Sequence, residues 1–126
     1  MISIAVCDDN EITAQEISEK VKQCCPIEAE VSVFYHIKDI LFSIHNENKL
    51  FDIIFMDPPY HLDLEERIVP YLLQSSLVKA GSLIIVETAL DTDVDYMYEL
   101  GCEVERIKEY KTNRHVFLRV PGETEA

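Results

Sequence analysis

The stretch that decides the fold runs Phe51-Asp52-Ile53-Ile54-Phe55-Met56-Asp57 and continues into Pro58-Pro59-Tyr60. Residues 51–56 are nearly all apolar, which is typical of a parallel strand buried between two layers of helices. Asp57 then stands at the carboxyl end of that strand, the edge at which open α/β sheets bind their ligands. The stretch therefore predicts a central strand that ends in a functional carboxylate.

The rest of the chain alternates between the apolar spacing of strands and that of helices. We expect strands near residues 2–7, 31–35, 51–56, 82–86, 104–110 and 115–120, and helices over 12–24, 37–44, 65–79 and 91–100. Pro70 is expected to break the third helix after a short first turn, and Gly81 to cap its end. No linker rich in Gly, Pro or Ser interrupts this pattern, so we expect one α/β domain over residues 1–126.

Charge and hydropathy restrict the partners. The formal net charge of −13 would repel a phosphate backbone, which argues against nucleic acid as a tight partner. No apolar run approaches the roughly 20 residues of a membrane span, and no charged leader precedes a cleavage site, so we expect a cytoplasmic protein without a membrane partner. The alternating charges Glu103, Glu105 and Lys108 on an edge strand fit a monomer or a weak dimer.

Three carboxylates follow two of the expected strands. Asp8 and Asp9 come directly after the first strand, and Asp57 after the third. If those strands are neighbours, the three side chains converge, and a hard cation such as Mg²⁺ would relieve their repulsion. The alternative is that Asp8 and Asp9 cap the first helix and Asp57 a loop. The four cysteines and four histidines show no metal-ligand spacing.

Residues 1–57 resemble the first half of a response-regulator receiver domain of the LytTR-associated type, through Ile4-Ala5-Val6-Cys7-Asp8-Asp9-Asn10 and the 51–57 stretch. The resemblance implies that Asp57 is a phosphoacceptor. It also implies Mg²⁺ ligands at Asp9, at Asp57 and at the Pro59 carbonyl, with Asp8 acting through water. Thr88 would fill the receiver's hydroxyl position. No matching lysine follows the fifth strand, so Lys111 or Arg114 would replace it or be solvated turn residues.

Residues from about 51 to 120 resemble the C-terminal half of the small-subunit ribosomal RNA guanine-N2 methyltransferases. The resemblance rests on Asp57-Pro58-Pro59-Tyr60, on residues 81–87 and on residues 110–118. It implies that the Asp57 side chain and the Pro58 carbonyl hold the target amine while Tyr60 stacks on the base. The alternative is that the two prolines only stiffen a loop.

The cofactor site of those enzymes has no counterpart in this sequence. They bind S-adenosylmethionine over a Gly-rich turn after the first strand, whereas the three glycines here are Gly81, Gly101 and Gly122. The first turn is Asp8-Asp9-Asn10 instead, and its side chains would crowd the cofactor. We therefore expect S-adenosylmethionine not to bind and methyl transfer not to occur.

The two resemblances meet within residues 51–57, which predicts a recombined or designed chimera of a receiver-like half, 1–57, and a methyltransferase-like half, 58–126. We expect an α/β scaffold without an evolved activity that retains weak Mg²⁺ binding; a phosphoacceptor receiver and a methyltransferase-like protein are the alternatives. Combining the two parents gives a three-layer, Rossmann-like or flavodoxin-like sandwich. Its mostly parallel six-stranded sheet would have the order 2-1-3-4-6-5, with strand 6 antiparallel.

Overall fold

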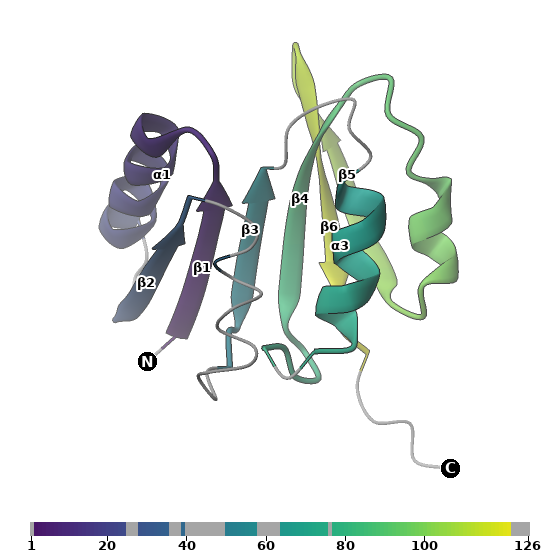
Figure 1. The fold of residues 1–126 in the computed structure, drawn as a ribbon, viewed down its shortest axis with the longest axis horizontal. Coiled ribbons are helices and arrows are strands. Elements are labelled where there is room, and N and C mark those ends of the chain that lie inside the picture. Colours follow the sequence, from purple (N-terminus) through teal and green to yellow (C-terminus); the bar gives the residue numbers. More distant parts are fainter. Residues whose placement is uncertain are drawn as a thin grey trace.

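A six-stranded sheet forms the centre of the molecule (Figure 1). The computed structural model describes residues 2–24, 28–35, 39, 50–57, 64–75 and 77–121. The strands lie in the order β2-β1-β3-β4-β6-β5; β6 is antiparallel to both of its neighbours, and the other pairs are parallel. The predicted strand order and the antiparallel strand 6 are therefore confirmed. The strand bounds are β1 Ile2–Asp8, β2 Ala29–Phe34, β3 Ile53–Asp57, β4 Leu83–Ala89, β5 Glu103–Glu109 and β6 Asn113–Arg119.

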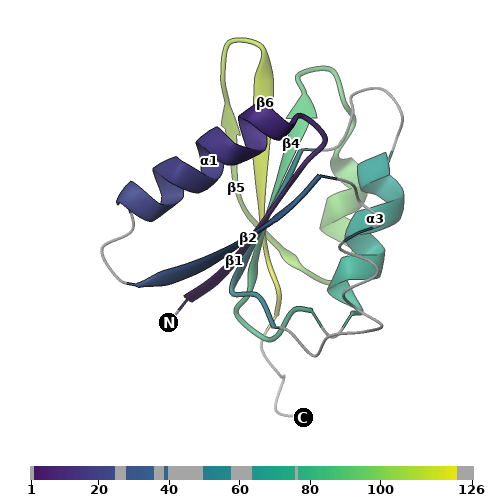
Figure 2. The ribbon, with the colours of Figure 1, turned by 60° about the vertical axis from the view of Figure 1, so that its left-hand side comes forward.

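Helices lie on both faces of this sheet, which confirms the predicted three layers. Figure 2 shows α1 (Glu11–Cys24) on one side, and α3 (Leu64–Leu73) with the short 3-10 helix η1 (Asp95–Glu99) on the other. No helix in the described part of the chain is long and apolar enough to cross a lipid bilayer.

Two apolar clusters separate these layers. In β3, Ile54 and Met56 are buried and belong to the larger cluster, whereas Phe55 is only half-buried and packs against the smaller one beside α1. The larger cluster also holds Cys7 of β1 and Val116 of β6. One core therefore contains residues from both sides of Asp57. Burying a large aliphatic side chain of this kind contributes roughly 1.5–3 kcal/mol.

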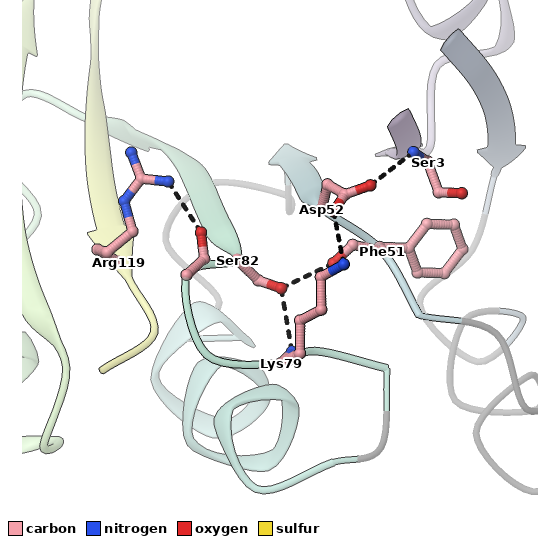
Figure 3. A network of polar contacts seen from close by, with 7 residues as sticks. Ser3, Phe51, Asp52, Lys79, Ser82 and Arg119 are labelled. Atoms are coloured by element: carbon pink, nitrogen blue, oxygen red, sulfur yellow. Dashed lines mark hydrogen bonds and ion pairs between the residues drawn. The ribbon is translucent and has the colours of Figure 1, made fainter. Parts of the chain in front are cut away.

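A polar network ties three strands together at their amino ends (Figure 3). Asp52 Oδ2 accepts a hydrogen bond from the Ser3 amide at 2.8 Å, and Oδ1 lies 2.9 Å from the Lys79 ammonium. The buried Ser82 hydroxyl donates to the Phe51 carbonyl at 2.8 Å and accepts from the Lys79 amide at 3.0 Å. The entries to β1, β3 and β4 are thus fixed at the end opposite Asp57.

Two helices differ from the expected ones, and a third lies outside the described residues. The helix expected over 65–79 ends at Leu73 and runs through Pro70 without a break; Ser75 ends it, since its hydroxyl and amide both donate to the Leu72 carbonyl. Gly81, with φ of +90°, therefore lies in the turn before β4. Of residues 37–44, only Asp39 is described.

The helix expected over residues 91–100 is reduced to η1. Asp93 Oδ1 accepts the Asp95 amide at 2.9 Å, a local turn that competes with helical hydrogen bonding. The Met97 and Leu100 amides then donate to carbonyls three residues back, which is the 3-10 pattern.

Candidate functional site

One row of polar side chains crosses the sheet near the carboxyl ends of its parallel strands. Asp8 of β1 is aligned with Asp57 of β3, Glu87 of β4 with His115 of β6, and His115 with Lys108 of β5. Asp57 and Glu87 are each one residue beyond the aligned pair Met56 and Val86, so the row continues from β3 to β4. Aligned residues point to the same face of a sheet. We call these five residues the polar row.

Aromatic rings support the β6 end of the polar row. The His115 ring lies edge-on to Phe55 with 5.4 Å between centroids, and Tyr110 contacts it at 4.8 Å. His115 Nε2 is also 3.0 Å from a Glu87 carboxylate oxygen. Since Phe55 belongs to the apolar cluster beside α1, the polar row lies on the α1 face of the sheet.

Asp57 is a strongly perturbed carboxyl group of the row. Burial raises the pKa of Asp57 to about 9, and the adjacent carboxylates of Glu87 and then Asp8 add to the rise. A carboxyl group in this environment is protonated at neutral pH when no cation is nearby. Its conjugate base is a much stronger proton acceptor than an ordinary aspartate.

Asp8 is almost completely buried, with 1% of its surface exposed. Burial raises its pKa, while the Asn10 amide, which donates to Oδ1 at 2.9 Å, opposes that rise. Oδ2 is buried and has no hydrogen-bond partner among the described residues. A buried acceptor without a partner costs free energy, so Asp8 favours a ligand that donates a hydrogen bond.

The structure brings together only some of the predicted site residues. Asp8 and Asp57 are aligned neighbours, whereas Asp9 is exposed in the bend between β1 and α1. Pro58, Pro59 and Tyr60 lie outside the described residues. Across the ranges that are described, no group of three or more His, Cys, Asp or Glu side chains is arranged to hold a metal ion. The Mg²⁺ site expected at Asp8, Asp9 and Asp57 therefore has no geometric support.

Thr88 and Arg114 lie away from Asp57. Thr88 is one residue beyond Glu87 in β4, so its side chain points to the opposite face, where its buried hydroxyl accepts from Arg114 Nε at 3.4 Å. The Arg114 guanidinium also donates to the Ala89 and Thr92 carbonyls. Arg114 therefore attaches the β5–β6 hairpin to the segment after β4, and Lys111 is exposed in the hairpin turn.

Sequence reasoning missed Glu87 and His115. Glu87 directly follows the mostly apolar run 82–86, just as Asp57 directly follows the run 51–56. This similarity could have identified Glu87 as a site residue. His115 had no such signal, because its place beside Glu87 depends on the register between β4 and β6.

Residues 1–119 match the family described as Conserved hypothetical protein 95. The chain belongs to this family. Among its relatives, an uncharacterized methylase of Rickettsia prowazekii is 35% identical over 72 residues, which cover 57% of this chain and 30% of that protein. Ribosomal RNA small subunit methyltransferase D of Haemophilus influenzae is 42% identical over 41 residues, which cover 32% of this chain and 21% of that protein. The chain thus spans less than a third of the curated relatives that it matches.

Solved structures support the same fold at lower identity. A conserved hypothetical protein from Streptococcus pyogenes superposes with a TM-score of 0.62 at 14% identity, covering 91% of this chain and 70% of that one. The release factor-specific protein-(glutamine-N5) methyltransferase of Alicyclobacillus acidocaldarius superposes with a TM-score of 0.57 at 14% identity. The superposition covers 96% of this chain and 80% of that one.

Family membership corrects the sequence-based interpretation. One family extends across Asp57 without interruption, so the predicted chimera of a receiver-like half and a methyltransferase-like half is wrong. The activity-free scaffold and the receiver interpretation are wrong with it, because the named relatives are methylases and methyltransferases. The same finding overturns our expectation against methyl transfer and S-adenosylmethionine. The acidic residues after the first and third strands misled us, since any doubly wound sheet gathers side chains at that edge.

Proposed function

We propose that this chain carries the amine-binding site of an S-adenosylmethionine-dependent methyltransferase that acts on guanine in small-subunit ribosomal RNA. The observation that carries the proposal is the position of Asp57. It is the first residue of Asp57-Pro58-Pro59-Tyr60, and it ends β3 in the middle of the polar row. The family match over residues 1–119, together with a relative named as a ribosomal RNA small subunit methyltransferase, supports the same assignment.

Asp57 performs two tasks in this proposal. Its carboxylate accepts an N–H of the target amine, which fixes the orientation of the nitrogen, and it then takes the proton that the nitrogen loses. The raised pKa of Asp57, about 9, makes its carboxylate a good proton acceptor once ionised. Ionisation requires a positive charge beside the polar row, because an opposite charge favours the charged form of a carboxyl group. By resemblance, the Pro58 carbonyl holds the second N–H and Tyr60 stacks on the base.

The described residues fit part of the expected cofactor. S-adenosylmethionine, when bound, supplies an activated methyl group on a positively charged sulfur. The buried and unpartnered Oδ2 of Asp8 fits a hydroxyl or ammonium donor of such a ligand. The turn after β1 is Asp8-Asp9-Asn10 rather than glycines, so this chain would hold the ligand through carboxylate acceptors.

Two measurements test the proposal. Calorimetric titration should show binding of S-adenosylmethionine, and transfer of a labelled methyl group to small ribosomal subunits should depend on Asp57. We expect Asp57→Asn to lower the transfer rate at least a hundredfold, since it removes the proton acceptor. Asp95→Asn, which removes the same charge from exposed η1, is the matched control and should keep the rate. Absence of both binding and transfer at millimolar cofactor would overturn the proposal.

A further inference from the structure

The β5–β6 hairpin has a charge opposite to that of the rest of the chain. Residues 103–119 contain five of the eleven basic residues and three acidic ones, a net charge of +2 with His neutral, in a protein whose net charge is −13. The tip of the hairpin projects beyond the carboxyl edge of the parallel strands (Figure 1). A local positive region thus extends past the same edge at which Asp57 ends β3.

The five basic side chains of this hairpin fall into three groups. Arg114 and Arg119 are engaged within the fold, the first with the carbonyls after β4 and the second with Glu105 at 2.9 Å and the Gly81 carbonyl. Lys108 and Lys111 are exposed, and neither forms an ion pair with any residue that the structure describes. Arg106 is also exposed and lies over the Phe117 ring, 5.8 Å from its centroid, further from the tip of the hairpin than the lysines. Near the tip, the two lysines are therefore the basic side chains available to an anionic partner.

An aromatic path leads from these lysines to the site. The Lys108 ammonium lies over the Tyr110 ring, 5.2 Å from its centroid, and 41% of Tyr110 is exposed. Tyr110 contacts the His115 ring, and His115 contacts Phe55, two residues before Asp57. Exposed aromatic rings beside lysines are the combination by which proteins bind single-stranded nucleic acid: rings stack on bases and ammonium groups contact phosphates.

We infer that the tip of the β5–β6 hairpin binds single-stranded RNA beside the amine site, with Tyr110 stacking on a base near the target and Lys108 and Lys111 contacting phosphates. The inference rests on the proposed function, which it deepens by naming the surface that holds the substrate. It departs from the expectation drawn from net charge, because phosphates respond to charges within about 8–10 Å at physiological salt rather than to the sum over the molecule.

RNA binding without cofactor tests this inference separately from methyl transfer. The probe is a fluorescein-labelled single-stranded oligoribonucleotide that contains guanines, titrated at several salt concentrations and followed by fluorescence anisotropy. We expect Lys108→Glu/Lys111→Glu to raise Kd at least tenfold at low salt. It should also reduce the slope of log K against log salt by about 1.4, since each phosphate contact on a single strand contributes about 0.7.

Matched variants separate the surface from net charge and from folding. Lys20→Glu/Lys22→Glu makes the same charge change on exposed positions of α1 and should leave Kd within about twofold. Tyr110→Ala should raise Kd on the order of tenfold, and Tyr110→Phe should restore binding because it keeps the ring. Circular dichroism and melting temperature check that each variant folds.

The outcomes distinguish the two proposals. A wild-type protein that does not bind the probe, or an equal loss in the α1 control, overturns the hairpin inference. Unchanged binding in both Tyr110→Ala and Lys108→Glu/Lys111→Glu overturns it as well. If the hairpin binds RNA but the protein neither binds S-adenosylmethionine nor transfers a methyl group, only the proposed function is overturned.

Discussion

His115 Nε2 lies 3.0 Å from Oε1 of Glu87, and the two side chains are only 20% and 16% exposed. The residues are aligned across β4 and β6, so the pair joins the hairpin to the middle of the sheet. Glu87 also acts on Asp57, because after burial its carboxylate is the largest contributor to the raised pKa of Asp57. The hairpin strand is thus connected to the proposed proton acceptor through one carboxylate.

Asp57 should make the stability of the protein depend on pH. Its pKa rises from 3.8 to about 9 on folding, so between these values the folded state keeps a proton that the unfolded state releases. Linkage then requires the free energy of unfolding to fall as pH rises from about 4 to about 9, by at most about 1.4 kcal/mol per pH unit. Urea unfolding across this range should show the fall in the wild type and a flatter profile in Asp57→Asn. Identical slopes would contradict the assignment.

Glu87→Gln should lower the pKa of Asp57. The substitution removes the negative charge next to Asp57 and keeps the size of the side chain, so the ionised form of Asp57 is repelled less. Carbon-detected NMR titration of the Asp57 carboxyl group measures the change directly. Glu103→Gln removes the same charge from an exposed position on the outer strand β5 and should leave the titration unchanged. Equal titration curves for Glu87→Gln and the wild type would show that Glu87 does not act on Asp57.

The positions of the strands could be predicted from the sequence because each strand carries a strong local signal, whereas the strand order came from the two family resemblances. The run 51–56 is apolar except for Asp52, and the turn at residues 110–113 separates two alternating segments. The bounds of the helices were harder to predict from the sequence, because the helix ends depend on single hydrogen bonds. The contacts of Ser75 with Leu72 end α3 six residues earlier than expected. The turn at Asp93 makes η1 begin at Asp95, whereas a helix was expected from residue 91.

Two of the five residues of the polar row were accessible to sequence reasoning. Asp8 and Asp57 each end an apolar run, so their meeting followed once β1 and β3 were neighbours. Thr88 was assigned to the same site, but the two-residue period of a strand places it on the opposite face from Glu87. Glu87 and His115 meet through a register between strands about 28 residues apart, which no local pattern fixes.

Asp52→Ala should destabilise the protein more than Lys79→Ala. The Ser3 amide, and then Lys79, lower the pKa of Asp52, so its contribution is present above pH 3.8 and is lost as pH falls through the lowered value. We expect a cost of about 1–2 kcal/mol for Asp52→Ala near pH 7, because a charge-assisted hydrogen bond is lost. Lys79→Ala should cost about 0.2–1 kcal/mol, since its ammonium is half exposed. Urea unfolding at neutral and acidic pH measures both, and a cost for Asp52→Ala that does not decrease as pH falls below 3.8 would contradict the mechanism.

Ser82→Ala should cost about 1–3 kcal/mol of stability. The hydroxyl is buried, donates to the Phe51 carbonyl and accepts from the Lys79 amide, so its removal takes one hydrogen bond from each of two backbone groups. Ser75→Ala is the comparison variant: its hydroxyl is only partly buried at the end of α3, where water replaces it, and its cost should be smaller. Thermal unfolding of both variants checks the order, and a larger loss in Ser75→Ala would reverse our account.

Cys7 should be protected from alkylation in the folded protein. Burial, followed by the charge of Asp8, raises the pKa of the Cys7 thiol to about 12. Compared with an ordinary thiol, this lowers the thiolate fraction at about pH 8 by roughly a thousandfold, and only the thiolate reacts. Cys102 is partly exposed and should be modified first of these two. Peptide mapping after iodoacetamide treatment, with and without urea, compares them. Cys7 is aligned with Met56 in the core and precedes Asp8. Modification of Cys7 as fast as Cys102 would therefore mean that β1 and β3 separate at their carboxyl ends in the native state.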